Sequence, residues 1–425
     1  MDELVLVPGA VLEVLLATQA PWGYLAFTDD DSEHLSVVSH YSAEDGPRYP
    51  INAGFFADHY TFRYGNEVWR GVWYRVPTEI NDATGPQLRR QESAISTQFL
   101  EDAVQGWRQP PVGAAMVVIT IADGDEGPSA LAWAVSRQGA QPLATTVVPE
   151  DPDPTGLLRS GWPIGDITSR LFTIIGLGSL GSAAADAIAA YGAHRFAFVD
   201  PDRLLHHNLV RHRAARRLLG KYKVHAVRET LLAQRPYLDI ATFTTSVVDD
   251  ADRMRPLFRS SSIVVCCADG IQARTVCSHL ARGANVPIVL ACVLDDGAFG
   301  EIIRLRPSRR VGCLQCQRAQ ARDAGHIDPE PGLELPYGTG DSHRPMTAVG
   351  GDLALVGQLA AKVAVATLLE AAGHADQRLA GDHNIVALRP APDAAYPFDL
   401  PRAGDTRWLA AAPPQPDCPT CGCCA

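Results

Sequence analysis

The sequence predicts an α/β protein in two parts, a smaller N-terminal α/β domain and a larger domain built on a mainly parallel sheet. A glycine-rich turn, Gly176 to Gly181, joins an apolar run to an Ala-rich helical stretch. Five short apolar runs alternate with helical patterns in the C-terminal part, as in a parallel sheet covered on both faces. Pro, Asp and Gly dominate Pro149 to Gly165, which predicts a linker. The predicted parts are therefore residues 1–148, a linker at 149–165, and residues 166–425.

The composition narrows the classes of partner. The chain has 425 residues, 46% of them hydrophobic, and a net charge of -11 from 37 basic and 48 acidic residues. This charge argues against nucleic acid and anionic membranes as partners. We expect no apolar run long enough to span a bilayer. The acidic start lacks the basic region of a signal peptide, so we expect a cytoplasmic protein.

The first 148 residues show helix and strand patterns but little recognisable chemistry. Helical patterns cover Val11–Ala17 and Ala94–Trp107, and strand patterns cover Tyr24–Phe27, Leu35–Val38, Val68–Tyr74, Ala115–Ile121 and Ala130–Val135. This order resembles the JAB/MPN metalloprotease fold, in which a Trp leads into a His-x-His-Pro metal motif. The corresponding stretch, Trp73 to Pro77, lacks both histidines, so zinc chemistry does not carry over. An unrelated α/β recognition domain is the alternative, and both interpretations predict a binding role.

In the second domain, the residues that follow the predicted parallel strands should lie together at one edge of the sheet. The apolar runs are Leu171–Ile175, Phe196–Val199, Ile240–Phe243, Ile263–Cys267 and Ile288–Cys292. An antiparallel strand at Gly300–Leu305 and a long helix at Asp352–Ala372 follow. Sheets of this kind bind ligands at the carboxyl ends of the strands.

The glycine turn predicts a phosphate-binding loop. Gly176 makes the turn, Gly178 lets a phosphate approach the backbone, and Gly181 lets the helix pack closely on the strand. The N–H groups at the start of the helix can bind an anion. Asp200 follows the next strand, where this arrangement often holds a ribose hydroxyl. Alone, this pattern predicts an ordinary nicotinamide- or flavin-binding domain.

Cations follow Asp200 in an otherwise acidic protein. They are Arg203, Arg211, Arg213, Arg216, Arg217, Lys221 and Lys223. A dinucleotide needs at most one such cation, whereas a triphosphate with a departing group needs several. A solvated basic helix face is the alternative. Asp269, just after the fourth apolar run, can hold Mg²⁺ against phosphate oxygens or simply cap a helix.

Four ordered motifs together resemble the ThiF/MoeB/ubiquitin-activating superfamily. DPDRLLHHNLVRH resembles its D-x-D-x-V-x-x-x-N-L-x-R-Q signature, GKYKV its G-x-x-K-A, and CADGIQAR its C-T-D-N-x-x-x-R, beside the GLGSLG turn. The resemblance implies a Rossmann-like, ThiF-type fold and a homodimeric adenylyltransferase. Such enzymes bind ATP and Mg²⁺ and attach AMP to the C-terminal carboxylate of a small ubiquitin-like protein or peptide.

The resemblance also implies roles for individual residues. Asp200 would hold the ribose, with Asp202 beside it in the nucleotide site, and Asp269 would bind Mg²⁺. Asn208, Arg211 and Lys223 would contact the phosphates, with the two cations offsetting charge on the departing pyrophosphate. The chain departs from the signatures at three places, His212, Cys266 and Gly270, and Cys266 replaces an acidic position.

Two CxxC pairs predict a metal site. Cys313 with Cys316, and Cys418 with Cys421, have the spacing of a Cys₄ zinc site, which the family resemblance also implies. Separate free thiols are the alternative. The family's thioester-forming Cys has no counterpart between Gln317 and Asp417, so we expect adenylation without a thioester in that loop.

Two further segments carry predictions from position alone. The loop Leu335–Met346, with Thr339, His343 and Arg344, is expected to meet the substrate, and Cys423 or Cys424 could act as a nucleophile or substitute ligand. Three functions remain open at this point. They are adenylation of a carboxyl terminus, an NAD-dependent oxidoreductase, and a non-catalytic ThiF-fold protein that binds only a partner.

Overall fold

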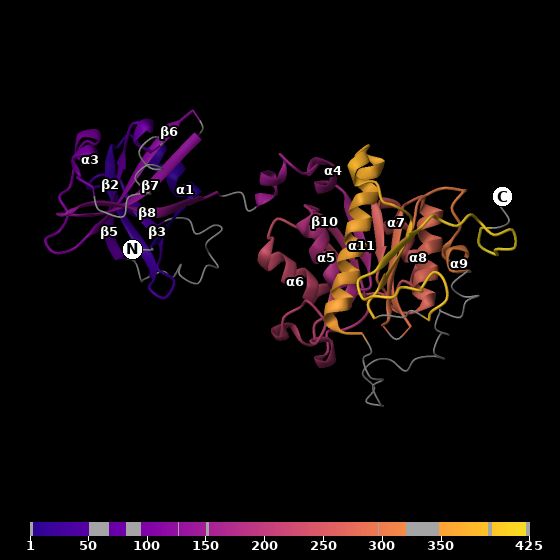
Figure 1. Ribbon diagram of the computed structural model, residues 1–425. Helices are drawn as coiled ribbons and strands as arrows, with labels where there is room; N and C mark the ends of the chain where they lie inside the picture. Colours follow the sequence, from indigo (N-terminus) through magenta and orange to yellow (C-terminus); the bar gives the residue numbers. More distant parts are fainter. Residues whose placement is uncertain are drawn as a thin grey trace. The chain divides into compact units, whose positions relative to one another are not determined.

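The chain forms two compact units, Met1–Pro152 and Asp153–Ala425. The computed structural model describes residues 3–50, 68–81, 95–125, 127–149, 153–295, 297–319, 348–389 and 393–421. Each unit contains its own eight-stranded sheet within these described ranges (Figure 1). The predicted linker is partly structured, because Pro154–Leu158 forms a 3₁₀ helix and Trp162 Nε1 donates a 2.9 Å hydrogen bond to the Tyr191 carbonyl of the second unit.

The first unit is a closed barrel, an architecture that the expectation of a smaller α/β domain did not specify. Its helices are α1 (Gly9–Ala17) and α3 (Gln98–Ala103). Its strands are β1 (Leu4–Pro8), β2 (Trp22–Asp30), β3 (Leu35–Ser42), β4 (Arg48–Pro50), β5 (Val68–Arg75), β6 (Met116–Gly124), β7 (Gly127–Ser136) and β8 (Gly139–Val148). The strand order is β1-β8-β7-β6-β5-β2-β3-β4, and a parallel pairing of β1 with β3 closes the sheet.

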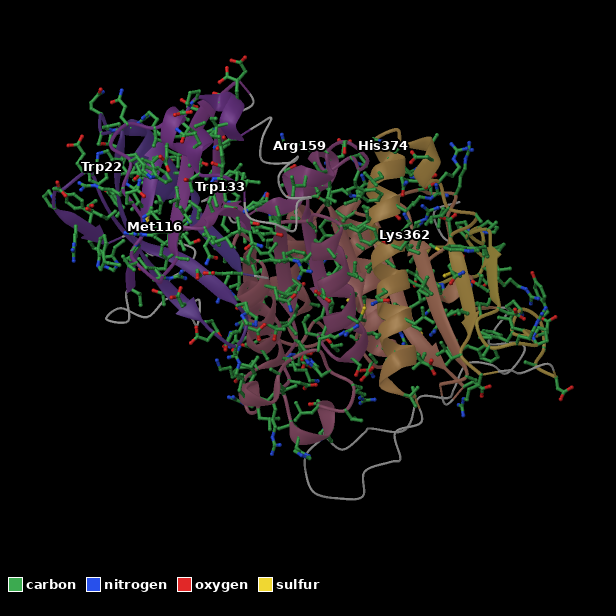
Figure 2. All side chains as sticks on the ribbon, turned by 60° about the vertical axis from the view of Figure 1, so that its left-hand side comes forward. Trp22, Met116, Trp133, Arg159, Lys362 and His374 are labelled. Atoms are coloured by element: carbon green, nitrogen blue, oxygen red, sulfur yellow. The ribbon has the colours of Figure 1, made fainter. Side chains whose placement is uncertain are left out.

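The core of this unit consists of two clusters of buried side chains, one packed against α1 and the other against α3. Val117 and Ile119 of β6 pack with the cluster that includes α1, whereas Val118 packs with Trp133 and Leu100 of α3. Trp22, Met116 and Trp133, labelled in Figure 2, all belong to the α3 cluster. Successive side chains of a strand point to opposite faces, so one strand supplies both clusters.

The stretch Trp73 to Pro77, which was compared with the JAB/MPN metal motif, forms hydrogen bonds that hold the first unit together. Trp73 is fully buried, and its Nε1 donates a 2.8 Å hydrogen bond to the Ser42 carbonyl. Arg75 Nη2 donates to the carbonyl oxygens of Leu15, Leu16 and Thr18 at 3.1, 3.0 and 2.7 Å. Arg75 thereby satisfies carbonyls at the end of α1, which have no partner within the helix.

The second unit has strand order β11-β10-β9-β12-β13-β14-β15-β16. Its strands are β9 (Leu171–Ile175), β10 (Arg195–Val199), β11 (Asp239–Phe243), β12 (Ile263–Cys266), β13 (Ile288–Leu294), β14 (Phe299–Leu305), β15 (His383–Ala387) and β16 (Thr406–Leu409). The pairs from β11 to β13 are parallel, whereas β13–β14, β14–β15 and β15–β16 are antiparallel. The predicted mainly parallel sheet is thus parallel over five strands only.

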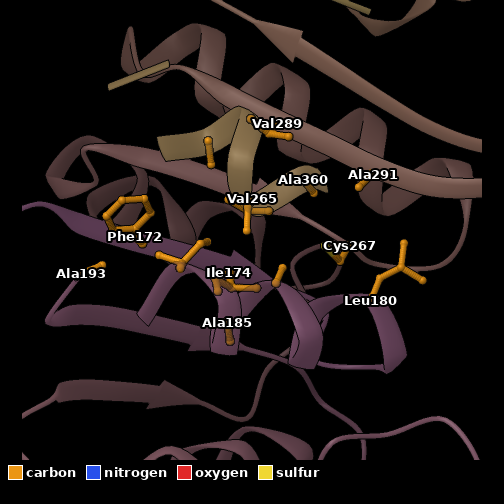
Figure 3. Close-up of a cluster of buried hydrophobic side chains, with 14 of the residues drawn as sticks. Phe172, Ile174, Leu180, Ala185, Ala193, Val265, Cys267, Val289, Ala291 and Ala360 are labelled. Carbon is orange, nitrogen blue, oxygen red and sulfur yellow. The ribbon is translucent and has the colours of Figure 1, made fainter. Parts of the chain in front are cut away.

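Helices cover both faces of this sheet. They are α4 (Gly165–Thr168), α5 (Ser179–Ala190), α6 (Lys223–Gln234), α7 (Ala251–Ser260), α8 (Ile271–Ala284), α9 (Leu314–Gln317) and α11 (Gly350–Ala371). Buried residues of α5, α6 and α11 pack with Phe172 and Val265, whereas those of α7 and α8 pack with Val264 and Leu290. Figure 3 shows Ile174 of β9 and Ala185 of α5 within the first of these clusters.

Helix α11 is the long helix that the sequence predicts, and it packs against α5. A Cβ at Gly357 would lie 2.5 Å from the Leu180 carbonyl oxygen, so glycine permits the close approach. Just after the end of α11, His374 Nε2 lies 2.7 Å from Asp166 Oδ2 of α4. Figure 2 labels His374 and also Lys362, which belongs to α11.

Helix α11 also has the length and composition of a membrane span, with 22 residues and a mean hydropathy of 1.6. The expectation that no segment reaches that length therefore fails for α11. Since 61% of its apolar window is buried inside the protein, the helix has the burial of a core element.

Candidate active site

A cleft of about 790 Å³ opens where the parallel strands end. Strand β9 precedes Gly176, β10 precedes Asp200, and β12 is followed by Cys267 and Asp269. The cleft lies between β9 and β12, where the strand order reverses, and such crevices are the usual ligand sites of open α/β sheets. Its polar lining contains eight predicted site residues, namely Gly176, Gly178, Asp200, Asp202, Asn208, Arg211, Lys223 and Asp269.

The glycine turn has the geometry that its sequence predicts. Gly176 has φ +82°, and a Cβ there would lie 2.6 Å from the backbone of Ala268. Gly181 lies behind the cleft, where a Cβ would lie 1.8 Å from the Gly176 carbonyl oxygen. Helix α5 begins after Gly178 with no side-chain cap and no acidic residue in its first turn. Its first N–H groups are therefore suited to an anion.

Asp200 holds this turn in place. One carboxylate oxygen accepts a 2.6 Å hydrogen bond from the Leu177 N–H, and the other accepts a 2.8 Å bond from the Asp202 N–H. Burial raises the pKa of Asp200 to about 6, although Lys223 and the two N–H groups favour its ionised form. Each carboxylate oxygen can accept more than one bond, so these contacts leave acceptor capacity for a ribose hydroxyl.

Two predicted phosphate-binding cations line the cleft with different partners. Lys223 Nζ lies 2.7 Å from Asp202 Oδ2. Burial lowers the pKa of Lys223, but the carboxylates of Asp200 and Asp202 outweigh it and the net shift is upward. Among the residues that the structure describes, no side chain pairs with Arg211, and its buried Nε makes no hydrogen bond.

Asn208 and His212 fix the segment that carries Arg211. Asn208 Oδ1 accepts a 2.8 Å hydrogen bond from the Leu205 N–H. His212 Nδ1 accepts from the Ala214 N–H at 3.0 Å, so Nε2 donates to the Leu177 carbonyl at 2.8 Å. Burial lowers the pKa of His212 to about 4, which keeps the ring neutral. His212, which stands where the family signature has Gln, thus donates to the glycine turn.

Asp269 lies exposed at the mouth of the cleft, directly before helix α8. Its carboxylate contributes to the raised pKa of Lys223, which places the two groups within electrostatic range. Gly270 has φ +81° and caps α8 without a side-chain hydrogen bond. Since Mg²⁺ prefers oxygen ligands, Asp269 is a suitable donor beside bound phosphates.

Most of the basic run turns away from the cleft, which corrects the expectation of cations gathered around phosphates. Arg217 Nη1 lies 2.6 Å from Glu229 Oε1, and Lys221 pairs with the other oxygen of Glu229. Arg203 lies over the Tyr222 ring at 4.0 Å. These side chains line a separate groove along α6, and Arg213 and Arg216 are exposed. Only Arg211 and Lys223 of the run belong to the cleft lining.

One cleft residue has no role in the sequence prediction. Arg274, in the first turns of α8, lines the cleft with a side chain that is 9% exposed. It stands in the CADGIQAR motif, which could have identified it, but its burial depends on how α8 packs. The predicted contacts at Thr339, His343, Arg344, Cys423 and Cys424 lie outside the described residues.

The two CxxC pairs come together away from the cleft. Cys313, Cys316, Cys418 and Cys421 are buried, with sulfur atoms all within 4.8 Å of one another. The Sγ–Sγ distances are 3.5 Å for Cys313–Cys418, 3.4 Å for Cys316–Cys421 and 3.9 Å for Cys313–Cys316. Four thiolates bound at about 2.3 Å around one tetrahedral zinc would be separated by roughly 3.8 Å. The donor set therefore fits a zinc ion.

Comparison with known proteins identifies the family. The ThiF family model matches residues 166–389, which is more than half of the chain, so the chain belongs to the ThiF family. It is 29% identical over 146 residues to molybdopterin-synthase adenylyltransferase from Salmonella typhimurium, covering 34% of this chain and 56% of that protein. It is 24% identical over 196 residues to ubiquitin-like modifier-activating enzyme 5 from Caenorhabditis briggsae, covering 42% and 44%.

The chain thus spans about half the length of the curated relatives it matches. Among solved structures, it is similar to E. coli MccB with a TM-score of 0.45 and 14% identity, over 61% of this chain and 69% of that one. This structural likeness is too weak to bear on function.

Proposed function

We propose that this chain uses ATP and Mg²⁺ to adenylate the C-terminal carboxylate of a small ubiquitin-like protein or peptide. One observation carries the proposal. The glycine turn, Arg211, Lys223 and Asp269 come from separate stretches of sequence and line one cleft at the switch point of the sheet. Family membership and the adenylyltransferase among the relatives support the same class of reaction.

Each residue has a role that follows from its position. The N-terminus of α5 and the glycine turn would bind phosphate oxygens, Asp200 would accept from the ribose, and Asn208 would contact the phosphates from the segment it fixes. Asp269 would hold Mg²⁺, which supplies charge neutralisation at the phosphates. Arg211 and Lys223 would offset the charge on the departing pyrophosphate.

The reaction needs alignment more than proton transfer. A substrate carboxylate is already ionised at neutral pH and can attack the α-phosphorus directly. Its oxygen forms a bond to that phosphorus while the bond to the β-phosphate oxygen breaks and pyrophosphate leaves. We also propose that the adenylate is not passed to an enzyme thiol in the loop before α11, since residues 317–417 contain no Cys.

The test measures pyrophosphate release from ATP·Mg²⁺ with the small protein that co-purifies with the tagged chain. Arg211→Ala and Asp269→Ala should each lower the rate by at least about 100-fold. Arg216→Ala, in the same basic run but exposed and outside the cleft, should stay within about twofold of wild type. Full activity in either cleft variant would contradict the assignment.

A structural zinc ion at the Cys₄ cluster is a second part of the proposal. The four buried sulfur atoms have the spacing that one tetrahedral ion needs. Metal analysis should find one zinc per chain, and Cys316→Ser should lose it together with thermal stability. Zinc-free protein of unchanged melting temperature would contradict this part.

Three further proposals continue the sequence predictions, and the family resemblance implies the first of them. The enzyme would be a homodimer, the barrel unit would help to recognise the partner protein, and the protein would be cytoplasmic. Analytical ultracentrifugation of the whole chain tests the first. Loss of partner binding on removal of residues 1–152, measured against the intact chain, tests the second.

A further inference from the structure

Arg274 differs from the other deeply buried arginines of the second unit. Arg304 and Arg318 are 2% and 3% exposed, and both form ion pairs with carboxylates. Arg274 is 9% exposed, its Nε is buried without a hydrogen-bond partner, and no described carboxylate pairs with it. Removing a charge from water without a partner costs free energy. A buried, unpaired cation that lines a cleft therefore indicates an anionic ligand.

The surroundings of Arg274 also favour an anion. Helix α8 has 14 residues, begins after Gly270 without a side-chain cap, and has no acidic residue in its first turn. The unpaired N–H groups of such a helix start attract negative charge. Asp269, two residues before the helix, already places one carboxylate there, and in the proposed function Mg²⁺ offsets its charge. Cys292 and Val293 of β13 also line the cleft. Burial raises the pKa of the Cys292 thiol and Arg274 partly offsets this rise, so the two side chains lie within electrostatic range.

Two helix starts, each with cationic side chains nearby, thus line the cleft. The start of α5, with Arg211 and Lys223, is one, and the start of α8, with Arg274, is the other. Adenylation needs two anionic reactants side by side, the triphosphate and the carboxylate. We propose that Arg274 and the N-terminus of α8 form the subsite that receives the substrate carboxylate, an inference that rests on the proposed function.

The guanidinium group suits this role. It is planar, always charged, and can donate two parallel hydrogen bonds to one carboxylate. Arg274 would orient the carboxylate so that one oxygen faces the α-phosphorus of ATP held at α5. Arg274 is in this account a positioning residue, because the bond changes occur at the carboxylate oxygen and the phosphorus.

The first measurement is the melting temperature of the full chain without ligand. Because Arg274 has no partner among the described residues, Arg274→Met should keep the wild-type melting temperature or raise it. The matched control is Arg304→Met, which leaves Glu370 and Asp382 without their buried cation and should lower the melting temperature by at least about 6 °C. A loss in Arg274→Met as large as in the control would overturn the proposal, since it would show a structural role.

The second measurement uses N-acetylalanine as a minimal carboxyl terminus and its amide as the control, at equal ionic strength. The acid at a concentration near its dissociation constant should raise the wild-type melting temperature by about 1 °C and the amide should not. Arg274→Met should lose this shift and Arg274→Lys should recover part of it. Equal shifts from acid and amide, no shift from the acid, or an unchanged shift in Arg274→Met would each overturn the subsite.

The same samples separate this inference from the proposed function. ATP·Mg²⁺ should raise the melting temperature of wild type and of Arg274→Met equally, because the triphosphate binds at the α5 end. Absence of any ATP shift in wild type would reject the proposed function, whatever N-acetylalanine does. An ATP shift that disappears only in Arg274→Met would instead place Arg274 in the nucleotide site and overturn the assignment to the carboxylate.

Discussion

Two regions of the second sheet contain arginines that differ in their ion pairing. One region is the antiparallel half of the sheet, and the other is the cleft at the carboxyl edge of the parallel strands. In the antiparallel half, Arg304 is paired with Glu370 and Asp382, and Arg318 with Glu301. In the cleft, Arg211 and Arg274 have no partner among the described residues. The first set is thus compensated within the protein, whereas we propose that a ligand compensates the second. Substitutions in the two regions should therefore affect stability and function in opposite ways.

The largest effect is expected in the paired region, at Glu301. Burial raises the pKa of Glu301, but Arg318 and His383 outweigh it, and the pKa lies well below its usual range. Arg318 Nε donates to Glu301 Oε2 at 2.9 Å. Glu301→Gln leaves the buried Arg318 charge without its counter-ion and should lower the free energy of unfolding by about 3–5 kcal/mol. Urea unfolding followed by circular dichroism measures this loss.

The control for Glu301→Gln is Glu229→Gln, which breaks the exposed pairs with Arg217 and Lys221. Exposed ion pairs contribute little, so its unfolding midpoint should stay at the wild-type value. Equal losses in both variants would show that burial does not set the strength of these pairs.

The next effect concerns the pH dependence of stability at the edge of the cleft. The pKa of His212 is about 4 in the folded protein, below its ordinary value of 6.5. The unfolded chain thus takes up a proton between these values and the folded chain does not. The stability that neutral His212 contributes is present above pH 6.5 and is lost as the pH falls toward 4, by roughly 3 kcal/mol.

The variant His212→Gln should remove this acid loss, because Gln can donate to the Leu177 carbonyl but does not titrate. Asp200 titrates in the same range with the opposite sign, since its pKa is raised, but it is present in both proteins and cancels in the comparison. Unfolding free energies of both proteins from pH 4 to 7.5 measure the difference. Parallel pH profiles would show that His212 is not buried as a neutral ring.

A smaller effect tests whether packing fixes the wall of the cleft. Leu180 of α5 lines the cleft, and a Cβ at Gly357 of α11 would lie 2.5 Å from its carbonyl oxygen. Gly357→Ala should therefore cost about 1–3 kcal/mol of unfolding free energy. Gly351→Ala, in the first turn of α11 with nothing within 4 Å, should be neutral or up to about 1 kcal/mol more stable. The reverse order in urea unfolding would contradict the close contact of α5 and α11.

Local sequence was sufficient for the parallel strands and the glycine turn. Gly176 and Asp200 follow an apolar run directly and Asp269 follows one after Ala268, so their places at the carboxyl edge depend on strand ends alone. The closed barrel was not predictable in this way, because β1 pairs in parallel with β3 and β8 across distant sequence. Charge alone also misled, since Arg203, Arg217 and Lys221 share the basic run with Arg211 but face another groove. The burial of Arg274 depends on how α8 packs, which the sequence does not reveal.

The most direct test of the central claim compares ligands on the intact chain. The glycine turn alone would suit NAD as well as ATP, whereas Arg211, Lys223 and Asp269 have a role only beside a triphosphate and its Mg²⁺. Differential scanning fluorimetry with ATP·Mg²⁺ and, separately, with NADH separates the two. The account predicts a melting temperature that rises with ATP·Mg²⁺ and does not change with NADH. A rise with NADH and none with ATP·Mg²⁺ would contradict it.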